Sequence, residues 1–551
     1  MLGFHRRTRS LIPVKDLAKY DKVSAFDDEY DEYEQETQQE VEQELEINHM
    51  PEGSDKSRQM QLVLVYIIFL AEAIMASSLQ PQLQMLLSSS DFCGTLSSSY
   101  LRSILDCAYA FGGTTGLFWG YLADRMGRRR VTLIGLWSMF VCCVSMGFAT
   151  TLFSCAIFRF VAGMVSSAIV CTTLTMLGDL SATGEERARN VARLPVISLG
   201  GSMGPIMQLM VSESLRSYNM VWQEYPTLGS ELVCGCIVFV IALVASICLK
   251  ETLLHHNERS TDAVDMDCER AAFLRRDSHD SHDTNVTLVD FARPEPITIT
   301  QFLQAPSLMV LLSSFCLLSL HASTFDVVLP HLGHSSTESA GMGLPCEWMN
   351  IIVLVVRGLA GTLVFCAIPY ATSKYGLVKL YRSLSALLPA TYVITPFLAA
   401  AVSCYGFGPS ISTFSIFAKY LLTDSATVVV SLLVLNTTPD AFSAGTVVGM
   451  MQVASLFKAF AVAVSGTSYY FSDNISVDTT NLALWTCLAL FGIAGAGLAW
   501  FVRERPSVEK DFPSEVLCWE TCFDADAEKQ FELEASDADT AGEGINGKRH
   551  R

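Results

Sequence analysis

The chain has 551 residues, of which 50% are hydrophobic and 17% charged, with a formal net charge of −19. This composition is too apolar for an ordinary soluble multidomain protein. The acidic residues are concentrated in the N-terminal tail, between about 250 and 300, and after Trp500. The net charge therefore describes these polar segments and not the apolar remainder of the chain.

Twelve apolar runs divide the rest of the sequence, each long enough at about 20 residues to cross a hydrocarbon core about 30 Å thick. No apolar run precedes Met60, so we predict a membrane helix at the first run and no cleaved signal peptide. Six runs come first, over 61–86, 99–121, 130–149, 153–178, 190–212 and 228–249. Six more follow, over 305–330, 347–372, 379–402, 410–436, 443–470 and 481–503.

The long polar segment between the sixth and seventh runs predicts two six-helix halves joined by a linker, as in a duplicated transporter. The expected fold class is thus an all-α membrane protein with twelve transmembrane helices in two six-helix halves. The expected domains are an acidic tail at 1–60, a first half at 61–249, a polar linker at 250–304, a second half at 305–503 and a tail at 504–551.

The basic residues predict the orientation of this topology. With both termini in the cytoplasm, the inner connections hold most of the lysines and arginines, whereas the outer ones hold little beyond Arg102 and Arg216. The inner set comprises Arg125, Arg128, Arg129, Arg130, Arg187, Arg189, Lys250, Arg270, Arg275, Arg276, Lys374, Lys379, Arg382, Arg503 and Arg505. Positive charge is retained on the cytoplasmic side, so we expect both termini there.

The stretch "GYLADRMGRRRVTL", residues 120–133, lies in the inner connection between the second and third helices. Its arginines can meet anionic headgroups, and Asp124 can cap a helix N-terminus. A topology signal would not require glycines at fixed spacing around Asp124, and Gly127 permits a turn that a side chain would obstruct. The stretch resembles the loop signature of the major facilitator superfamily, G-x-L-A-D-R-x-G-R-R/K, at Gly120, Leu122, Asp124, Arg125, Gly127, Arg128 and Arg129.

Further motifs resemble the drug:proton antiporter branch of this superfamily. "RFVAG", with Arg159 and Gly163, resembles the R-x-x-x-G element of proton-coupled members in helix four. "LGGSMGPIM" in helix five resembles the antiporter signature ending in G-P-x-x-G-G. The matching residues there are Gly200, Gly204 and Pro205, whereas Gln208 and Leu209 replace the final glycines.

Segments in helices one, seven and eleven are similar to fungal multidrug-type and plant zinc-induced-facilitator-like members, over residues 60–505. Helix eleven departs from those relatives, because Lys458 replaces an arginine and Val462 a proline. The resemblance implies the major facilitator fold and a secondary active transporter that couples proton entry to efflux of a small molecule by alternating access. A proton symporter that imports a nutrient and a non-transporting receptor or scaffold remain alternatives.

Ionisable side chains within the spans are candidates for the transport chemistry, since each costs about 2.5–3.5 kcal/mol or more at the bilayer centre unless it is paired or hydrated. Arg102 and Asp106, one turn apart, can pair with each other near the outer surface, and for Asp106 and Arg357 a structural ion pair and a role in transport are both open. Because helices one, four, seven and ten line the cavity in the superfamily, the expected proton and substrate cavity comprises Glu72, Gln80, His321, Asp326, Lys419 and Asp424.

Glu72 and Asp326 are the expected proton carriers, because a carboxylate in a membrane cavity can exchange protons as its hydration changes. Arg159 and the loop motif would gate the cavity. Gly112, Gly116 and Gly120 on helix two, and Gly445 and Gly449 on helix eleven, recur at four-residue spacing and would allow close contact between the halves.

The remaining signals are weaker. The seventeen cysteines lie mostly in apolar runs and predict no disulfide framework, and "SHDSHD" lacks the spacing of a zinc site, so we expect no metal and no cofactor. No phosphate-binding loop or nucleophile–base pair is present, so neither ATP-driven transport nor an enzyme is expected.

We expect a monomer, in the plasma or vacuolar membrane, that binds protons, a small molecule and lipid but no nucleic acid. Ser278 follows a basic pair, and Asn474 heads a glycosylation sequon on the outer side.

Overall fold

The structure is a computed structural model, and within the residues that it describes all regular elements are helices. The residues that it describes are 52–77, 98–202, 204–206, 210, 214, 225, 227–253, 303, 305–334, 342, 346–405, 408–438, 443–472 and 478–502. Most of the predicted N-terminal tail, the C-terminal tail and most of the linker, together with Gln80, Ser278 and Asn474, lie outside these residues. The first membrane helix begins earlier than predicted, because residues 52–60 of the predicted tail form the start of a helix.

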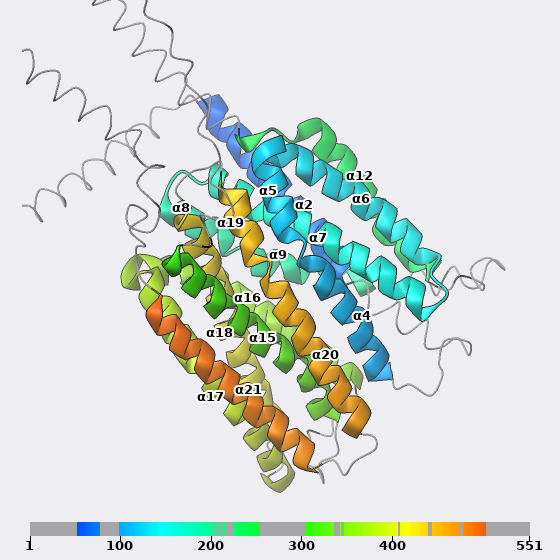
Figure 1. The fold of residues 1–551 in the computed structure, drawn as a ribbon, viewed down its shortest axis with the longest axis vertical. Coiled ribbons are helices and arrows are strands. Elements are labelled where there is room, and N and C mark those ends of the chain that lie inside the picture. Colours follow the sequence, from blue (N-terminus) through cyan, green and yellow to red (C-terminus); the bar gives the residue numbers. More distant parts are fainter. Residues whose placement is uncertain are drawn as a thin grey trace, which may run out of the picture. The chain divides into compact units, whose positions relative to one another are not determined.

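The helices follow the twelve predicted runs (Figure 1). The first half contains α2 (Glu52–Ser77), α4 (Ser98–Gly113), α5 (Gly116–Met126), α6 (Arg128–Gly147), α7 (Leu152–Leu180), α8 (Gly184–Val191), α9 (Leu194–Gly201) and α12 (Leu228–Cys248). The second contains α15 (Pro306–His334), α16 (Cys346–Tyr375), α17 (Leu377–Tyr405), α18 (Gly408–Asn436), α19 (Ala444–Met451), α20 (Ala454–Ser472) and α21 (Asp478–Phe501). Among the described residues, nine helices are by themselves long and apolar enough to cross a membrane.

Three of the predicted spans are divided or only partly described. The second span consists of α4 and α5, the eleventh of α19 and α20, and the fifth begins with α9. The predicted start of the fifth span at residue 190 was too early, because α8 is a separate short helix and α9 begins only at Leu194, with Pro195 in its first turn. A proline suits that position because its missing N–H would be unpaired there anyway.

Each half has its own buried core. In the first, α7 packs against α4 and α6, and α6 against α12. In the second, α17 packs against α18 and α21, and α15 against α21. Large apolar side chains such as Phe118, Ile247 and Phe397 are nevertheless exposed, as a surface that faces lipid requires.

The two halves contact each other through two helix pairs: α19 packs on α5, and α20 packs on α4 (Figure 1). On another side of the bundle, α16 contacts α8 and α9. The contacts of α19 with α5 and of α20 with α4 bring together residues that are more than 300 positions apart in the chain. Together with the contacts of α16, they define the space between the halves.

Two glycines with left-handed backbone lie in equivalent turns of the halves. Gly127 (φ 96°) joins α5 to α6, and Gly376 (φ 76°) joins α16 to α17. A positive φ is readily adopted only by glycine, because other residues bring their Cβ too close to the backbone. The turns that link the second to the third and the eighth to the ninth spans therefore have a similar design.

Candidate functional site

Asp124, in the last turn of α5, binds the beginning of α19 in the other half. Its carboxylate accepts hydrogen bonds from the backbone N–H groups of Gly445 (2.8 Å) and Thr446 (2.6 Å), and from the Thr446 hydroxyl (2.7 Å). The side chain of Ser443, at the N-cap position of α19, makes no capping hydrogen bond. Asp124 thus supplies the cap from the opposite half, where its charge also complements the positive end of the helix dipole.

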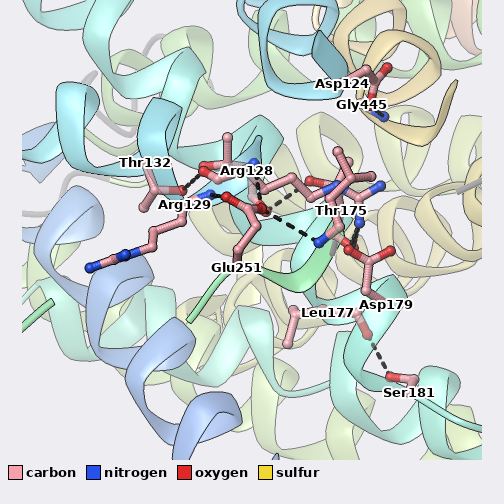
Figure 2. A network of polar contacts seen from close by, with 12 residues as sticks. Asp124, Arg128, Arg129, Thr132, Thr175, Leu177, Asp179, Ser181, Glu251 and Gly445 are labelled. Atoms are coloured by element: carbon pink, nitrogen blue, oxygen red, sulfur yellow. Dashed lines mark hydrogen bonds and ion pairs between the residues drawn. The ribbon is translucent and has the colours of Figure 1, made fainter. Parts of the chain in front are cut away.

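The first turn of α6 is likewise capped by a distant carboxylate (Figure 2). Glu251, three residues beyond α12, accepts from the backbone N–H of Arg128 at 2.8 Å and from that of Arg129 at 3.1 Å. A Cβ on Gly127 would lie 2.5 Å from this carboxylate. Glycine is required there both by the positive φ and by the position of Glu251.

Arg128 is fully buried and points toward the end of α7 (Figure 2). Its guanidinium forms an ion pair with Asp179 and donates to the carbonyl of Thr175 at 3.4 Å. It also interacts electrostatically with Asp124 and Glu251. Arg128 therefore connects the acidic residues that hold α5, α7 and α19 at this end of the bundle, which we call the motif end.

The other arginines of the motif have different surroundings. Arg129 donates to the Ser246 carbonyl of α12 at 3.0 Å. Arg125 is exposed and stacks over the Tyr121 ring, with 4.5 Å between guanidinium carbon and ring centroid. Only part of the predicted gating motif therefore lies at the contact between the halves, and Arg125 lies on the surface.

The glycines of helices two and eleven meet as the sequence predicts, with one exception. A Cβ on Gly120 would come within 2.1 Å of the Gly445 carbonyl oxygen, and one on Gly449 within 2.7 Å of the Gly116 carbonyl oxygen. Gly112 instead faces the backbone of Phe160 in α7. Side chains at the meeting positions would force the halves apart.

A cavity of about 280 Å³ lies between the halves, close to the lower end of the range of about 300–1,000 Å³ that is usual for small-molecule sites. It is lined from both halves by residues of α2, α7, α9, α15, α16, α18, α19 and α20. Its polar lining includes Thr173, Ser198, Ser202, Thr427, Ser431, Gln452 and Ser455. The cavity can therefore form hydrogen bonds with a small polar molecule.

Three charged side chains line this cavity: Arg357 from α16, Asp424 from α18 and Lys458 from α20. Arg357 and Lys458 are both exposed to the space between the helices. Arg357 interacts electrostatically with Asp424 and with Asp326 of α15. Its guanidinium carbon lies 4.9 Å from the ring centroid of Tyr420. The cavity thus presents two cations and one anion to its contents.

Asp326 and Lys419 form an ion pair beside the cavity, with 2.5 Å between the lysine nitrogen and the carboxylate oxygen. The Lys419 side chain is fully buried, whereas that of Asp326 is 39% exposed. Lys419 also donates to the Ala322 carbonyl at 3.4 Å. Of the predicted cavity residues that the structure describes, Asp424 lines the cavity, and Asp326 and Lys419 form a pair next to it.

Glu72 does not line this cavity, contrary to the prediction. It is buried within the first half, where its carboxylate accepts from the hydroxyls of Ser166 at 2.5 Å and Tyr109 at 3.2 Å. Lys458 interacts with it electrostatically across the halves. The face of α2 that carries Glu72 is turned toward α4 and α7, and Phe69 lines the cavity in its place.

His321 does not line the cavity either, although it was predicted to do so. Its Nδ1 lies 2.6 Å from the Tyr392 hydroxyl, within hydrogen-bonding distance, and it packs against Gly495 of α21. The side chain is buried in the core of the second half and is turned away from the cavity. A histidine five residues before Asp326 points in a different direction on the same helix, since five residues correspond to 500° of rotation at 100° each.

Arg159 of α7 lies inside the first half, against the Tyr109 ring at 4.8 Å. The helix-five residues Gly200 and Gly204 pack against α2, where a Cβ would meet Leu70 at 3.1 Å and Ile74 at 2.8 Å. Pro205 follows Gly204 in a helical turn and is half-buried. These motif residues allow close packing of α2, α7 and the fifth span rather than contact with the contents of the cavity.

Three acidic side chains of the structure were not among the predicted functional residues: Glu251, Asp179 and Glu231 of α12. An acidic residue at the end of a span, as in "LGDLS" and "LKETL", is a signal that could have indicated the first two, because the arginine cluster lies at the same end of the bundle. Glu231 lies one turn inside its span, at the end of the bundle remote from the arginine cluster, so no such signal marked it in the sequence.

Among the described residues, membrane-spanning helices in two halves enclose a cavity that carries polar and charged side chains, which is the arrangement of a membrane transporter. A sequence model described as Major Facilitator Superfamily matches residues 62–463, so the chain belongs to this superfamily.

Relatives with similar sequences support the predicted branch. Protein ZINC INDUCED FACILITATOR 1 of Arabidopsis thaliana is 24% identical over 75% of this chain and 85% of its own length. The Major facilitator superfamily multidrug transporter mfsB of Aspergillus fumigatus is 19% identical over 71% and 74%. The predicted similarity to plant zinc-induced-facilitator-like and fungal multidrug-type proteins is confirmed.

Two solved structures share the fold. The human organic anion transporter MFSD10 (TETRAN) matches 82% of this chain and 100% of its own, with a TM-score of 0.52 and 14% identity. The proton:xylose symporter XylE, bound to 6-bromo-6-deoxy-D-glucose, matches 81% and 95%, with a TM-score of 0.53 and 15% identity. At these identities the similarity extends to the fold alone.

Proposed function

We propose that this transporter exports a small polar molecule in exchange for protons. The observation that carries the proposal is that Asp424 lines the same cavity as the cations Arg357 and Lys458. A substrate would present a cationic or hydrogen-bond-donating group to Asp424 and an anionic or accepting group to Arg357 and Lys458. Binding of both groups would favour a polar molecule over a purely apolar one.

Competition for the Asp424 carboxylate would couple the two fluxes. The cationic group of a substrate binds the ionised carboxylate, whereas a proton neutralises it and removes that attraction. Protonation would also free Arg357 from one of its two acidic partners, Asp424 and Asp326. A transporter in which proton and substrate exclude each other from one site works as an antiporter, because each must leave before the other binds.

The motif end would act as the gate. The hydrogen bonds of Asp124 to α19 hold the two halves together there, and they would break when the cavity opens on that side. In the orientation expected from the basic residues, with both termini in the cytoplasm, the motif end faces the cytoplasm. Tags after Met1 and Arg551 and near Ser278 should then be protected from external protease in intact cells, whereas a tag near Ser335 should be cleaved if the protein is at the surface.

Inside-out membrane vesicles with an acidified lumen would test the function. They would be incubated with a defined mixture of polar metabolites, and the retained compounds would be measured by mass spectrometry. Wild-type protein should concentrate at least one compound, and a protonophore should abolish this. Asp424→Asn protein of equal abundance should lose the concentration against a gradient.

Other results would contradict the proposal in distinguishable ways. Protons leave the acidified lumen. Movement of a compound out of the lumen in the same direction would indicate the importing symporter. No handling of any compound, combined with a cellular phenotype on removal of the acidic tails, would indicate the receptor or scaffold.

A further inference from the structure

A buried cluster of sulfur and carboxylate groups lies in the first half, at the end of the bundle remote from Asp124. Cys143 lies near the end of α6, and Glu231 and Cys234 lie in the first two turns of α12. All three side chains are buried. None of them lines the cavity between the halves, so the transport proposed above does not use them.

The spacing of the three groups suits a tetrahedral metal ion. The sulfurs of Cys143 and Cys234 are 3.6 Å apart, and they lie with a Glu231 carboxylate oxygen within 4.8 Å of one another. Two thiolates bound to zinc at about 2.3 Å with a tetrahedral angle have sulfurs about 3.8 Å apart. The side chains therefore need only small adjustments to bind one ion.

Glu231 supplies an independent indication of a ligand. Glu231 is 1% exposed, and its Oε1 atom has no hydrogen-bond partner within the described part of the chain. A buried carboxylate oxygen without a hydrogen-bond partner is unfavourable, since it has lost its hydrogen bonds to water and gained none in exchange. A cation bound between Glu231 and the two cysteines would satisfy this oxygen.

The surroundings select a single ion rather than an organic molecule. A cavity of about 10 Å³ adjoins the cluster, and this is about the volume that one water molecule needs. Its lining includes Glu231, Cys143 and Arg159 together with further sulfur atoms, from Met75, Cys142 and Met146. Sulfur ligands favour soft or borderline ions such as Zn²⁺ over Mg²⁺ or Ca²⁺.

Charge balance favours a divalent ion. Two thiolates and one carboxylate around Zn²⁺ carry one net negative charge, and the guanidinium of Arg159 beside Glu231 balances it. A monovalent Cu⁺ ion would leave one negative charge uncompensated in the membrane interior, which is unfavourable. The carboxylate oxygen is also a ligand that zinc accepts readily.

We propose that Cys143, Cys234 and Glu231 form a buried Zn²⁺ site that fastens α6 to α12. Binding converts two thiols to thiolates and releases two protons, as Zn²⁺ forms two zinc–sulfur bonds and one zinc–oxygen bond. A water molecule in the small adjoining cavity would be the fourth ligand of the tetrahedral ion. The site stabilises the first half and does not lie on the transport path. It also departs from the sequence-based expectation that the chain has no metal ligands.

Metal binding to the full-length protein in detergent, purified with a non-chelating reductant, tests the site. Co²⁺ serves as the probe, because thiolate ligation gives a charge-transfer absorption and tetrahedral geometry gives intense visible bands. Wild-type protein should show both, and added Zn²⁺ should abolish them. Cys143→Ser and Cys234→Ser should lose the charge-transfer absorption, and Glu231→Gln should bind Co²⁺ at least tenfold more weakly.

The matched control is Cys316→Ser, which removes a buried thiol from α15 in the other half. It should keep the Co²⁺ spectrum, and Zn²⁺ should raise its melting temperature as in the wild type, because a ligand that binds only the folded state stabilises it. Zn²⁺ should also protect Cys143 and Cys234 from alkylation, as measured on peptides by mass spectrometry. If a cysteine variant fails to fold, Glu231→Gln and this protection still test the site.

Two results would overturn the proposal. One is a Co²⁺ spectrum and a zinc-dependent melting temperature that are identical in wild type, Cys234→Ser and Glu231→Gln. The other is a Cys143–Cys234 disulfide in protein isolated from membranes, combined with no zinc binding after reduction. Selective binding of Cu⁺ without Zn²⁺ would likewise contradict the charge-balance argument.

Discussion

Asp124 concentrates three hydrogen bonds between the halves on one carboxylate, and all three come from the first turn of α19. Hydrogen bonds to a charged acceptor are worth about 1.5–3 kcal/mol each, more than neutral ones. Both the charge and the two acceptor oxygens are therefore needed to hold the motif end together.

Asp124→Asn keeps the size of the side chain but replaces one acceptor with a donor that faces backbone N–H groups. We expect correct insertion, slower transport, and a shift of about 1–3 kcal/mol away from the state closed at the motif end, the usual scale of coupling between global states. Transport rate and the labelling of a cysteine introduced at Ser431, which lines the cavity, measure the two effects. Arg130→Gln removes an exposed charge from the same cluster and should leave the transport rate and the labelling unchanged. Normal transport by Asp124→Asn would mean that the motif serves only as a topology signal.

Glu72 and Asp424 are matched candidates for the proton carrier, and their positions predict different phenotypes. Asp424→Asn should abolish transport against a gradient while downhill exchange continues. Glu72→Gln can still accept from Ser166 and Tyr109, so it should slow transport without a change in its pH dependence. Initial rates across a pH series would distinguish them, and the reverse pattern would return the carrier role to Glu72.

At the scale of helices, the breaks in the second and eleventh spans lie opposite each other. Gly113, at the end of α4, faces Ser455 near the start of α20, and Gly116, at the start of α5, faces Gln452 between α19 and α20. Gln452 and Ser455 also line the cavity. Both spans are thus interrupted where the halves meet beside the cavity.

Gly120→Ala tests the close contact between α5 and α19. The added methyl would overlap the Gly445 carbonyl, and overpacking of this kind costs about 1–3 kcal/mol. We expect a lower melting temperature and impaired closure at the motif end. Gly497→Ala, where nothing lies within 4 Å of the added Cβ, is the control and should be neutral or stabilising by up to about 1 kcal/mol. Equal effects of the two substitutions would show that the contact is not limiting.

At the scale of the whole molecule, the halves are joined at the motif end in at least two places. Besides Asp124 on α19, Arg187 of α8 donates to the side chain of Asn436 at the end of α18, at 2.8 Å. Burial lowers the pKa of the Arg187 guanidinium, although an arginine stays charged at neutral pH. The gating proposed above would require both contacts to open together.

A reversible cross-link at the second contact tests this requirement. In the double variant Arg187→Cys and Asn436→Cys, a short bifunctional thiol reagent with a reducible bond should link the halves. Transport should stop in the linked fraction and return when the link is reduced. Each single variant treated in the same way controls for the native cysteines. Undiminished transport by fully linked protein would mean that the halves do not separate at this end.

The sequence by itself determined the twelve spans, because each helix in a membrane must satisfy its own backbone and be apolar over a fixed length. It also determined local contacts such as the ion pair of Arg102 with Asp106, one turn apart at 3.5 Å, and the glycines that allow helices two and eleven to meet. These features depend on composition and on the spacing of nearby residues, and both can be determined directly from the sequence.

Only the tertiary structure decided which side chains share an environment. Asp124 binds a backbone 321 positions away, Glu251 caps a helix that begins 123 positions earlier, and Glu231 meets two cysteines in the core of the first half. Glu72 was expected in the cavity and instead binds Ser166, because the rotation of α2 is set by its packing against other helices. The physical reason is that an apolar sequence tells a helix to enter the membrane, whereas the partner of a polar group within it depends on how distant helices pack.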